Sequence, residues 1–207
     1  ESVSPVTMTF VLNYPFTVTQ TADYSVTGGT ATNGADYNLA AGTVSFAPGE
    51  VSKTVDFTVV NDLILEDDET AVVSLSNPSS EVTLGANDTY TYTIIDDDVL
   101  YVSFSAGTAS ENEGNATRSV GAPTLTLSGA ILQSAASVNL SVTNGTAQSD
   151  DWSQTGGVIS IPAGNYVAAT QLAIPSAALS ILGDNTVEPD ETINLSLNSF
   201  EIGRASC

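Results

Sequence analysis

The chain has almost no basic residues and almost no sulfur. Its 207 residues carry 24 acidic side chains against three basic ones, Lys53, Arg118 and Arg204, so the formal net charge is −21. There is no histidine, and the single cysteine is Cys207, the last residue. An internal disulfide and a Ser-His-Asp triad are therefore excluded. We also expect no nucleic acid or anionic membrane as a partner, because Lys and Arg are what hold both.

Long apolar runs are also lacking. No stretch is long enough to cross a bilayer, so we expect no membrane insertion, and no secretory signal is present. Strand-like sequence lies close to both ends, which we interpret as a fragment of a longer protein. The hydrophobic fraction of 42% and the charged fraction of 13% are those of a folded chain and not of a disordered one. Frequent Val, Thr, Tyr, Ile and Phe, with Gly and Pro between them, favour strands over helices.

Two stretches of the chain repeat each other. Gly29-Thr30-Ala31 matches Gly145-Thr146-Ala147, and an acidic run follows each copy, at residues 61–70 and 183–192. Both runs hold Asp, then Glu four residues on, then Asp-Glu-Thr after one more residue. The repeat exceeds one hundred residues, so each copy is expected to be a domain and not one turn of a solenoid.

Alternation of apolar and polar residues predicts the fold class. Residues 54–59 and 192–197 each place apolar side chains at every second position, as in strands that bury one face. One apolar face per strand implies sheets packed face to face. We therefore expect an all-β chain of two tandem immunoglobulin-like β-sandwiches, residues 1–98 and residues 99–207, the second incomplete at its C-terminus. The triplet Asp96-Asp97-Asp98 marks the boundary.

The acidic runs need a counter-charge. Clustered carboxylates repel one another unless a cation lies among them, and the chain offers almost no Lys or Arg. A hard divalent metal is the expected partner, and Ca²⁺ is the first choice because it takes six to eight oxygens at loosely fixed angles. The runs lack the EF-hand spacing, zinc would need His or Cys, and Mg²⁺ uses fewer carboxylates. The alternative is that these runs are solvated surface that also blunts sheet edges.

Four separated motifs resemble one family. Residues 29–37, 46–49, 62–69 and 96–98 occur in the order found in the Calx-beta domain, and the resemblance extends over most of both copies. It implies an immunoglobulin-like sandwich of seven strands. Domains of this family occur as Ca²⁺-sensing modules of sodium–calcium exchangers, in integrin β4 and in bacterial surface proteins and adhesins.

The resemblance also implies the metal ligands. In the first copy they are the side chains of Asp36, Asp62, Glu66 and Glu69, the backbone carbonyl of Ile64, the carboxylates of Asp96, Asp97 and Asp98, and Glu1 as the acid of the first strand. In the second copy they are Asp151, Asp184, Glu188 and Glu191, with either Glu111 or Glu113 in the place of Glu1. The second copy lacks the terminal Asp triplet, and Asn185 and Thr186 lie between its acids, so we expect a weaker site there.

These observations favour a non-catalytic function. The first hypothesis is a Ca²⁺-binding module of a cell-surface or secreted adhesion protein, extracellular or at the cell surface, in which Ca²⁺ stiffens the junction between repeats. The second is a regulatory Ca²⁺ sensor of a transporter or signalling protein. Expected partners are calcium ions and neighbouring repeats of the same chain, and a protein or carbohydrate ligand is a further possibility. A glycosidase with paired carboxylates is the enzyme alternative that we set aside.

Overall fold

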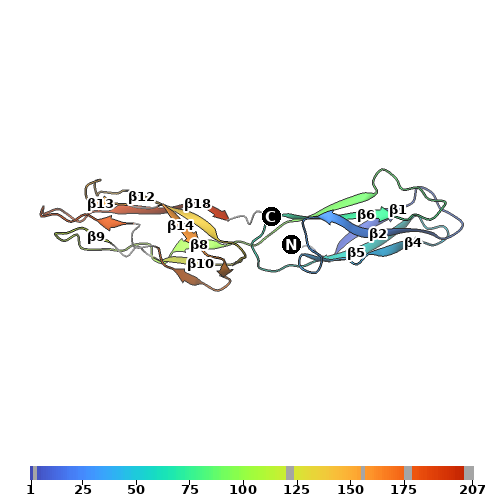
Figure 1. Ribbon diagram of the computed structural model, residues 1–207, viewed down its shortest axis with the longest axis horizontal. Coiled ribbons are helices and arrows are strands. Elements are labelled where there is room, and N and C mark those ends of the chain that lie inside the picture. Colours follow the sequence, from blue (N-terminus) through green and yellow to red (C-terminus); the bar gives the residue numbers. More distant parts are fainter. Residues whose placement is uncertain (2–3, 120–123, 155–156, 175–178, 203–207) are drawn as a thin grey trace. The chain divides into compact units, whose positions relative to one another are not determined.

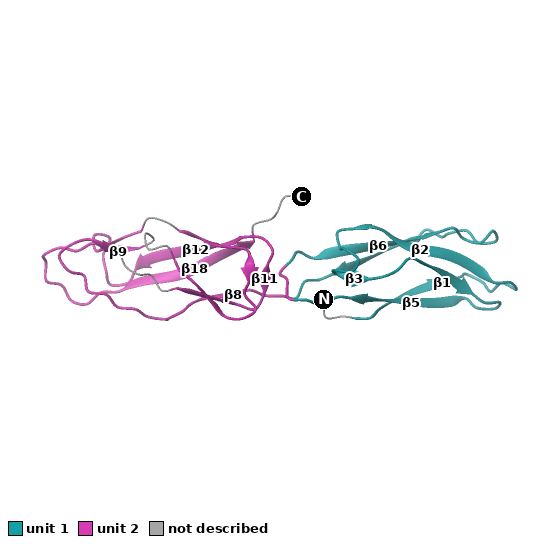
Figure 2. Cartoon of the chain, turned by 60° about the horizontal axis from the view of Figure 1, so that its bottom comes forward, with its two compact units in different colours: residues 1–62, 66–97 teal, residues 63–65, 98–207 magenta. Residues whose placement is uncertain are grey.

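The computed structural model forms two compact units. The first consists of Glu1–Asp62 with Glu66–Asp97, and the second of Leu63–Leu65 with Asp98–Cys207. Figure 2 shows them in separate colours. The structure describes the whole chain except residues 2–3, 120–123, 155–156, 175–178 and 203–207. Cys207 and the C-terminal end of the second repeat therefore lie outside the described residues.

The first unit contains two antiparallel sheets. One has the strand order β4-β2-β6-β7 and the other the order β1-β5-β3 (Figure 1). Its strands are β1 (Val6–Val11), β2 (Gln20–Gly29), β3 (Tyr37–Asn38), β4 (Gly42–Phe46), β5 (Ser52–Val59), β6 (Glu69–Ser76) and β7 (Thr89–Ile94). The pairing of β2 with β6 shifts register between Val26 and Gly28, where Thr27 forms a bulge. The long pair β2–β6 ends beside the acidic run.

The second unit repeats this plan and adds short strands of two residues. Its main sheets have the orders β14-β12-β18 and β16-β10-β8, with the small sheets β13-β17-β9 and β11-β15 beside them. The strands are β8 (Tyr101–Phe104), β9 (Arg118–Ser119), β10 (Leu125–Ser128), β11 (Ile131–Leu132), β12 (Ala136–Asn144), β13 (Trp152–Ser153), β14 (Val158–Ile161), β15 (Gly164–Asn165), β16 (Thr170–Leu172), β17 (Ser180–Ile181) and β18 (Ile193–Ile202). Here β12 and β18 stand where β2 and β6 stand in the first unit.

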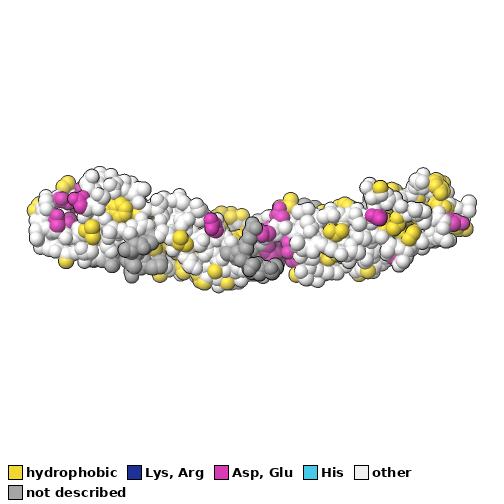
Figure 3. Space-filling view, turned by 45° about the horizontal axis from the view of Figure 1, so that its top comes forward, with side chains coloured by type: hydrophobic (Ala, Val, Ile, Leu, Met, Phe, Trp, Pro, Cys, Tyr) yellow, Lys and Arg dark blue, Asp and Glu magenta, His cyan; other side chains and the backbone are white. Residues whose placement is uncertain are grey.

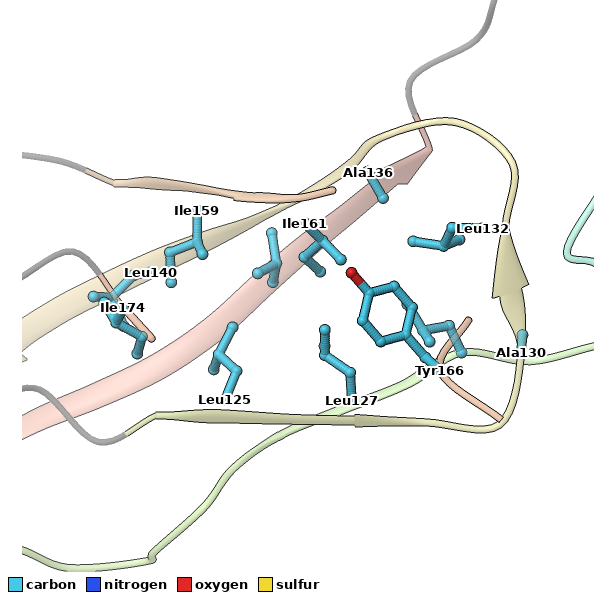
Figure 4. Packing of buried hydrophobic residues seen from close by; sticks show 12 residues of the cluster. Leu125, Leu127, Ala130, Leu132, Ala136, Leu140, Ile159, Ile161, Tyr166 and Ile174 are labelled. Atoms are coloured by element: carbon cyan, nitrogen blue, oxygen red, sulfur yellow. The ribbon is translucent and has the colours of Figure 1, made fainter. Parts of the chain in front are cut away.

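Alternating side chains build a core between the sheets of each unit. In the first unit Phe57 packs edge-on against Tyr37 and Tyr92, with ring centroids 6.4 and 5.3 Å apart. In the second unit Leu125, Leu127 and Ile161 are fully buried. Figure 4 shows Leu125 and Leu127 side by side, both pointing toward Ile161, with Tyr166 beside them. Burying one such aliphatic side chain stabilises the folded state by about 1.5–3 kcal/mol. The core therefore fixes the strands that carry the acidic loops.

The expected fold class is confirmed. Strands account for all the regular secondary structure that the described residues form, and they pack as two tandem sandwiches. No helix of membrane-spanning length and hydropathy occurs in the described part of the chain. The alternating stretch at 54–59 lies within β5, and that at 192–197 lies almost wholly within β18. The domain boundary after residue 98 stays a prediction, and the structure assigns Leu63–Leu65 to the second unit.

Candidate metal centres

Three carboxylates from two segments of the chain converge in the first unit. Oxygen atoms of Asp36, Glu66 and Glu69 all lie within 4.8 Å of one another. Asp36 lies directly before β3, Glu66 lies in the loop before β6, and Glu69 is the first residue of β6. Asp36 is one of two buried polar or charged side chains among the described residues, with 9% of its surface exposed. The convergence brings Asp36 together with two glutamates that lie thirty and more positions further along the sequence.

A tight turn fixes the Asp36 carboxylate. Its Oδ2 accepts a hydrogen bond of 2.5 Å from the backbone N–H of Thr32. The backbone N–H of Asp36 donates to the Thr32 carbonyl at 3.0 Å, and its own carbonyl accepts from Val60 at 2.9 Å. Side-chain bonds of this kind between Asp and a nearby backbone N–H are typical of turns. Asp36 is thus held from both sides before any ligand binds.

The electrostatics of Asp36, Glu66 and Glu69 favour the binding of a cation. Burial, followed by the charges of Asp36 and Asp62, raises the pKa of Glu66 to about 6. Burial and a hydrogen bond shared with Asp36 raise the pKa of Glu69 to about 7. Raised pKa values of this origin mean that keeping these carboxylates ionised costs free energy in the metal-free chain. Hard oxygen donors in this number and density fit Ca²⁺, which would be held by Asp36, Glu66 and Glu69.

Further acids surround this group. The Asp62 backbone N–H donates to Glu1 Oε2 at 3.2 Å, and the Glu66 backbone N–H donates to Asp96 Oδ2 at 3.1 Å. The Asp96 backbone N–H donates in turn to Asp68 Oδ1 at 3.2 Å. The charges of Glu1 and Asp96 both contribute to the raised pKa of Glu66. Glu1, Asp62 and Asp96 therefore belong to the electrostatic surroundings of Glu66, and their role as metal ligands stays a prediction.

Ile64, Asp97 and Asp98 are placed differently. Ile64 forms a parallel bridge with Ile131 of β11, in which Leu65 N–H donates to the Ile131 carbonyl at 3.0 Å. In such a bridge the peptide groups of Ile64 itself face away from β11. Asp97 is exposed and Asp98 is half-buried. Asp98 begins the main segment of the second unit, residues 98–207. Their predicted roles as ligands remain predictions.

The second unit holds a matching group. Oxygen atoms of Asp151, Glu188 and Glu191 also lie within 4.8 Å of one another. Asp151 Oδ2 accepts from the Gln148 backbone N–H at 2.5 Å, just as Asp36 accepts from Thr32. Loss of hydration and then the charge of Asp151 raise the pKa of Glu188. Acidic side chains gather at one end of this unit in the space-filling view (Figure 3).

The structure distinguishes the two candidates for the first-strand acid of the second repeat. Glu113 Oε1 accepts a hydrogen bond of 3.3 Å from the backbone N–H of Asp184, the same contact that Glu1 makes with Asp62. Glu111 instead forms an ion pair of 2.8 Å with Arg118. Glu113 therefore occupies the position equivalent to Glu1. Asp184 itself accepts from the Thr186 backbone N–H at 2.6 Å.

The ligand prediction left out two pairs of threonines. Thr30 and Thr70 bond to each other in the first unit, and Thr146 and Thr192 do so in the second. The signal was present in the sequence, because both Gly-Thr-Ala and Asp-Glu-Thr recur in each repeat. Without a charge, these residues carried no sign of a role at a metal site.

Comparison with known proteins identifies two matches to one family model. The model of the Calx-beta domain matches residues 5–98 and residues 96–206. Among curated relatives, sodium/calcium exchanger 1 of Rattus norvegicus is 38% identical over 93 residues, covering 37% of this chain and 10% of that protein. The exchanger 1 of Bos taurus is 34% identical over the same length. The chain spans about a tenth of the length of the curated relatives it matches.

Solved structures give a weaker likeness. A crystal structure of the calcium binding domain CBD12 of CALX1.1 is 20% identical, with a TM-score of 0.46, covering 99% of this chain and 78% of that one. The apo form of the Calx CBD1 domain is 33% identical, with a TM-score of 0.38, covering 40% of this chain and 73% of that one. At these TM-scores the likeness adds nothing to the fold described above.

Proposed function

Because this chain belongs to the Calx-beta domain family, with two copies in tandem, we propose that it is a non-catalytic Ca²⁺-binding module. The observation that carries the proposal is the convergence of Asp36, Glu66 and Glu69 within 4.8 Å, with pKa values of the two glutamates raised to about 6 and about 7. A bound dication would offset both the burial and the mutual repulsion that raise them. The Asp151 group of the second unit is proposed as a weaker site, because Glu188 and Glu191 are exposed.

We propose a regulatory role in place of the adhesive one expected first. The relatives described above are sodium/calcium exchangers, and the chain corresponds to about a tenth of their length. A short Ca²⁺-binding segment within a longer protein suits a sensor. Ca²⁺ binding to such a segment would change the activity of other parts of the protein. An extracellular or cell-surface location stays a prediction, which protease treatment of intact cells would test. A protein or carbohydrate ligand stays a prediction as well.

Ca²⁺ is further proposed to stiffen the chain around Leu63–Leu65. These residues belong to the second unit, whereas Asp62 and Glu66 on either side belong to the first. Ordering Asp62 and Glu66 around a metal would restrict the segment between them. Small-angle scattering with Ca²⁺ and with chelator tests this idea, and identical profiles would refute it.

Calorimetric titration with Ca²⁺ tests the proposed function directly. We expect two classes of site in the wild-type chain, and loss of the tighter class in Glu66→Ala. Glu81→Ala is the control, because Glu81 accepts a hydrogen bond from Gln20 and belongs to neither of the two acid groups described above. Heats no larger than those of dilution in the wild-type chain would end the proposal. Titration with Mg²⁺ under the same conditions measures selectivity.

A further inference from the structure

A pair of threonines joins the two segments that carry the acids of the first unit. The backbone N–H of Thr70 donates to Thr30 Oγ1 at 2.9 Å, and the backbone N–H of Thr30 donates to Thr70 Oγ1 at 3.4 Å. The Ala31 N–H adds a bond of 2.9 Å to the Thr70 carbonyl. Each threonine hydroxyl thus accepts from the backbone of the other. We call this pair the first threonine clasp.

The second unit contains the same arrangement. The Thr192 N–H donates to Thr146 Oγ1 at 2.9 Å, and the Thr146 N–H donates to Thr192 Oγ1 at 3.0 Å. The Ala147 N–H donates to the Thr192 carbonyl at 3.2 Å, as Ala31 does to Thr70. We call Thr146 and Thr192 the second threonine clasp. The same pattern of bonds therefore occurs in both repeats, at the two motifs that they share.

Glycine makes the close approach possible. A Cβ atom on Gly29 would overlap the Thr70 carbonyl, and one on Gly145 would overlap both the hydroxyl and the carbonyl of Thr192. Gly29 also has a φ of +110°, which residues with a side chain rarely adopt. The Gly-Thr pair that begins each motif therefore has two roles in the clasp. The glycine lets the two backbones approach each other, and the threonine hydroxyl forms a hydrogen bond between them.

Each clasp lies where the acids of its unit meet. Thr70 directly follows Glu69, and Thr30 begins the segment that leads through the turn at Thr32 to Asp36. The second clasp has the same relation to Glu191 and Asp151. Within each unit, the two segments joined by hydroxyls are the same two that bring like-charged carboxylates within 4.8 Å. The clasp therefore opposes the repulsion that would separate them.

We propose that the two threonine clasps are positioning elements for the metal sites, holding the Asp-bearing turn and the Glu-bearing strand together before the metal arrives. The inference rests on the proposed function. A site assembled in advance binds with its intrinsic affinity, whereas a site that must first close loses affinity in proportion to the fraction that is open. The clasp hydroxyls touch no metal in this scheme, and their effect passes through Asp36 and Glu69, or through Asp151 and Glu191.

Thr30→Val tests the first clasp, because valine keeps the shape of threonine and lacks the hydroxyl. We expect the Ca²⁺ affinity of the first site to fall about tenfold, because the Thr70 N–H loses the one hydrogen bond that it donates to the Thr30 hydroxyl. Thr30→Ser keeps the hydroxyl and should bind nearly as well as the wild-type chain. Thr146→Val should weaken the second site alone.

Thr27→Val is the matched control. Thr27 lies on β2 and shares a hydroxyl contact of 2.6 Å with Ser74 of β6, so it also bonds to β6 but away from the acids. The Thr27→Val substitution should leave the Ca²⁺ affinity of the first site unchanged. If Thr30→Val lowers the melting temperature as much as Thr27→Val does and binds Ca²⁺ like the wild-type chain, the clasp is merely structural and the proposal is overturned.

Hydrogen exchange of the metal-free chain supplies a readout that needs no metal. In Thr30→Val the Thr70 amide should exchange at least about tenfold faster than in the wild-type chain, and faster than in Thr27→Val. Unchanged exchange would show that the clasp is not closed without metal and would overturn the inference. A wild-type chain that binds no Ca²⁺ would instead refute the proposed function, whatever the exchange rates are.

Discussion

The acid groups of the two units have one scaffold in common and differ in what surrounds it. Asp36 and Asp151 are each held by a backbone N–H four or three residues earlier, and each group stands beside a threonine clasp. Asp36 is buried, whereas the second group consists of a half-buried aspartate and two exposed glutamates. The repeated motif thus sets the positions of the carboxylates, and burial sets how strongly they repel one another and attract a cation.

Removing one acid from each group gives the largest effect. Asp36→Asn deletes a buried charged ligand, and we expect Ca²⁺ affinity at the first site to fall about a hundredfold, since ligand charge tunes affinity. Asp151→Asn should produce a smaller loss at the second site, because water already competes there. Isothermal titration of both variants measures the difference. Equal losses would show that burial does not separate the two groups.

Chelation should destabilise the first unit more than the second. A ligand present at about 100 times its Kd stabilises the folded state by about 2.7 kcal/mol, which for a domain of this size corresponds to about 10 °C in melting temperature. Scanning calorimetry with Ca²⁺ and with EDTA measures the shift. Asp36→Asn and Asp151→Asn assign each transition to its unit. If EDTA lowers only the melting temperature of the second unit, the expected difference between the two units is wrong.

The pH dependence of the metal-free chain should be larger in the first unit. Folding raises the pKa of Glu66 to about 6 and that of Glu69 to about 7, from 4.5. A raised carboxyl pKa means that the folded state binds the proton more tightly, so stability rises as pH falls from about 7 toward about 4.5. In EDTA the first unit should therefore melt at a higher temperature at about pH 5.5 than at about pH 8. A flat profile would show that these carboxylates are hydrated.

The smallest effect separates two neighbouring acids of the second repeat. Glu113 contacts the Asp184 backbone, and its charge contributes to the raised pKa of Glu188, so Glu113→Gln should change affinity at the second site about threefold. Glu111→Gln breaks an ion pair with Arg118 that is worth less than about 1 kcal/mol and should leave affinity unchanged. Ca²⁺ titration of the two variants compares them. The reverse order would reassign the first-strand acid.

Sequence alone predicted the strands well, because alternation is a local property. Residues 54–59 fall in β5, and the Asp36, Glu66 and Glu69 that converge were all named from the family resemblance. Sequence left Glu111 and Glu113 open, because two acids two positions apart face the same side of an extended chain. Only the placement of Arg118 and of the Asp184 backbone separates them.

Other features depend on contacts between distant segments. The clasps consist of uncharged residues about forty positions apart, so nothing in either segment alone reveals the partner. The bridge between Ile64 and Ile131 pairs residues 67 positions apart within the second unit, and no periodicity indicates such a pairing. The local sequence pattern therefore predicted the strands and most of the acids. The hydrogen bonds that hold the acids in place could be identified only from the structure.

The assignment of Leu63–Leu65 to the second unit has a practical consequence for cutting this chain into pieces. A fragment beginning at residue 99 would lose the Leu65 side chain that packs against its core and the backbone that bonds Ile131 at 2.7 and 3.0 Å. Its β11 edge would be left bare and ready to pair with other molecules. Expressed by itself, the later repeat should aggregate more readily than the tandem, and a peptide spanning residues 62–66 supplied in trans should restore its solubility.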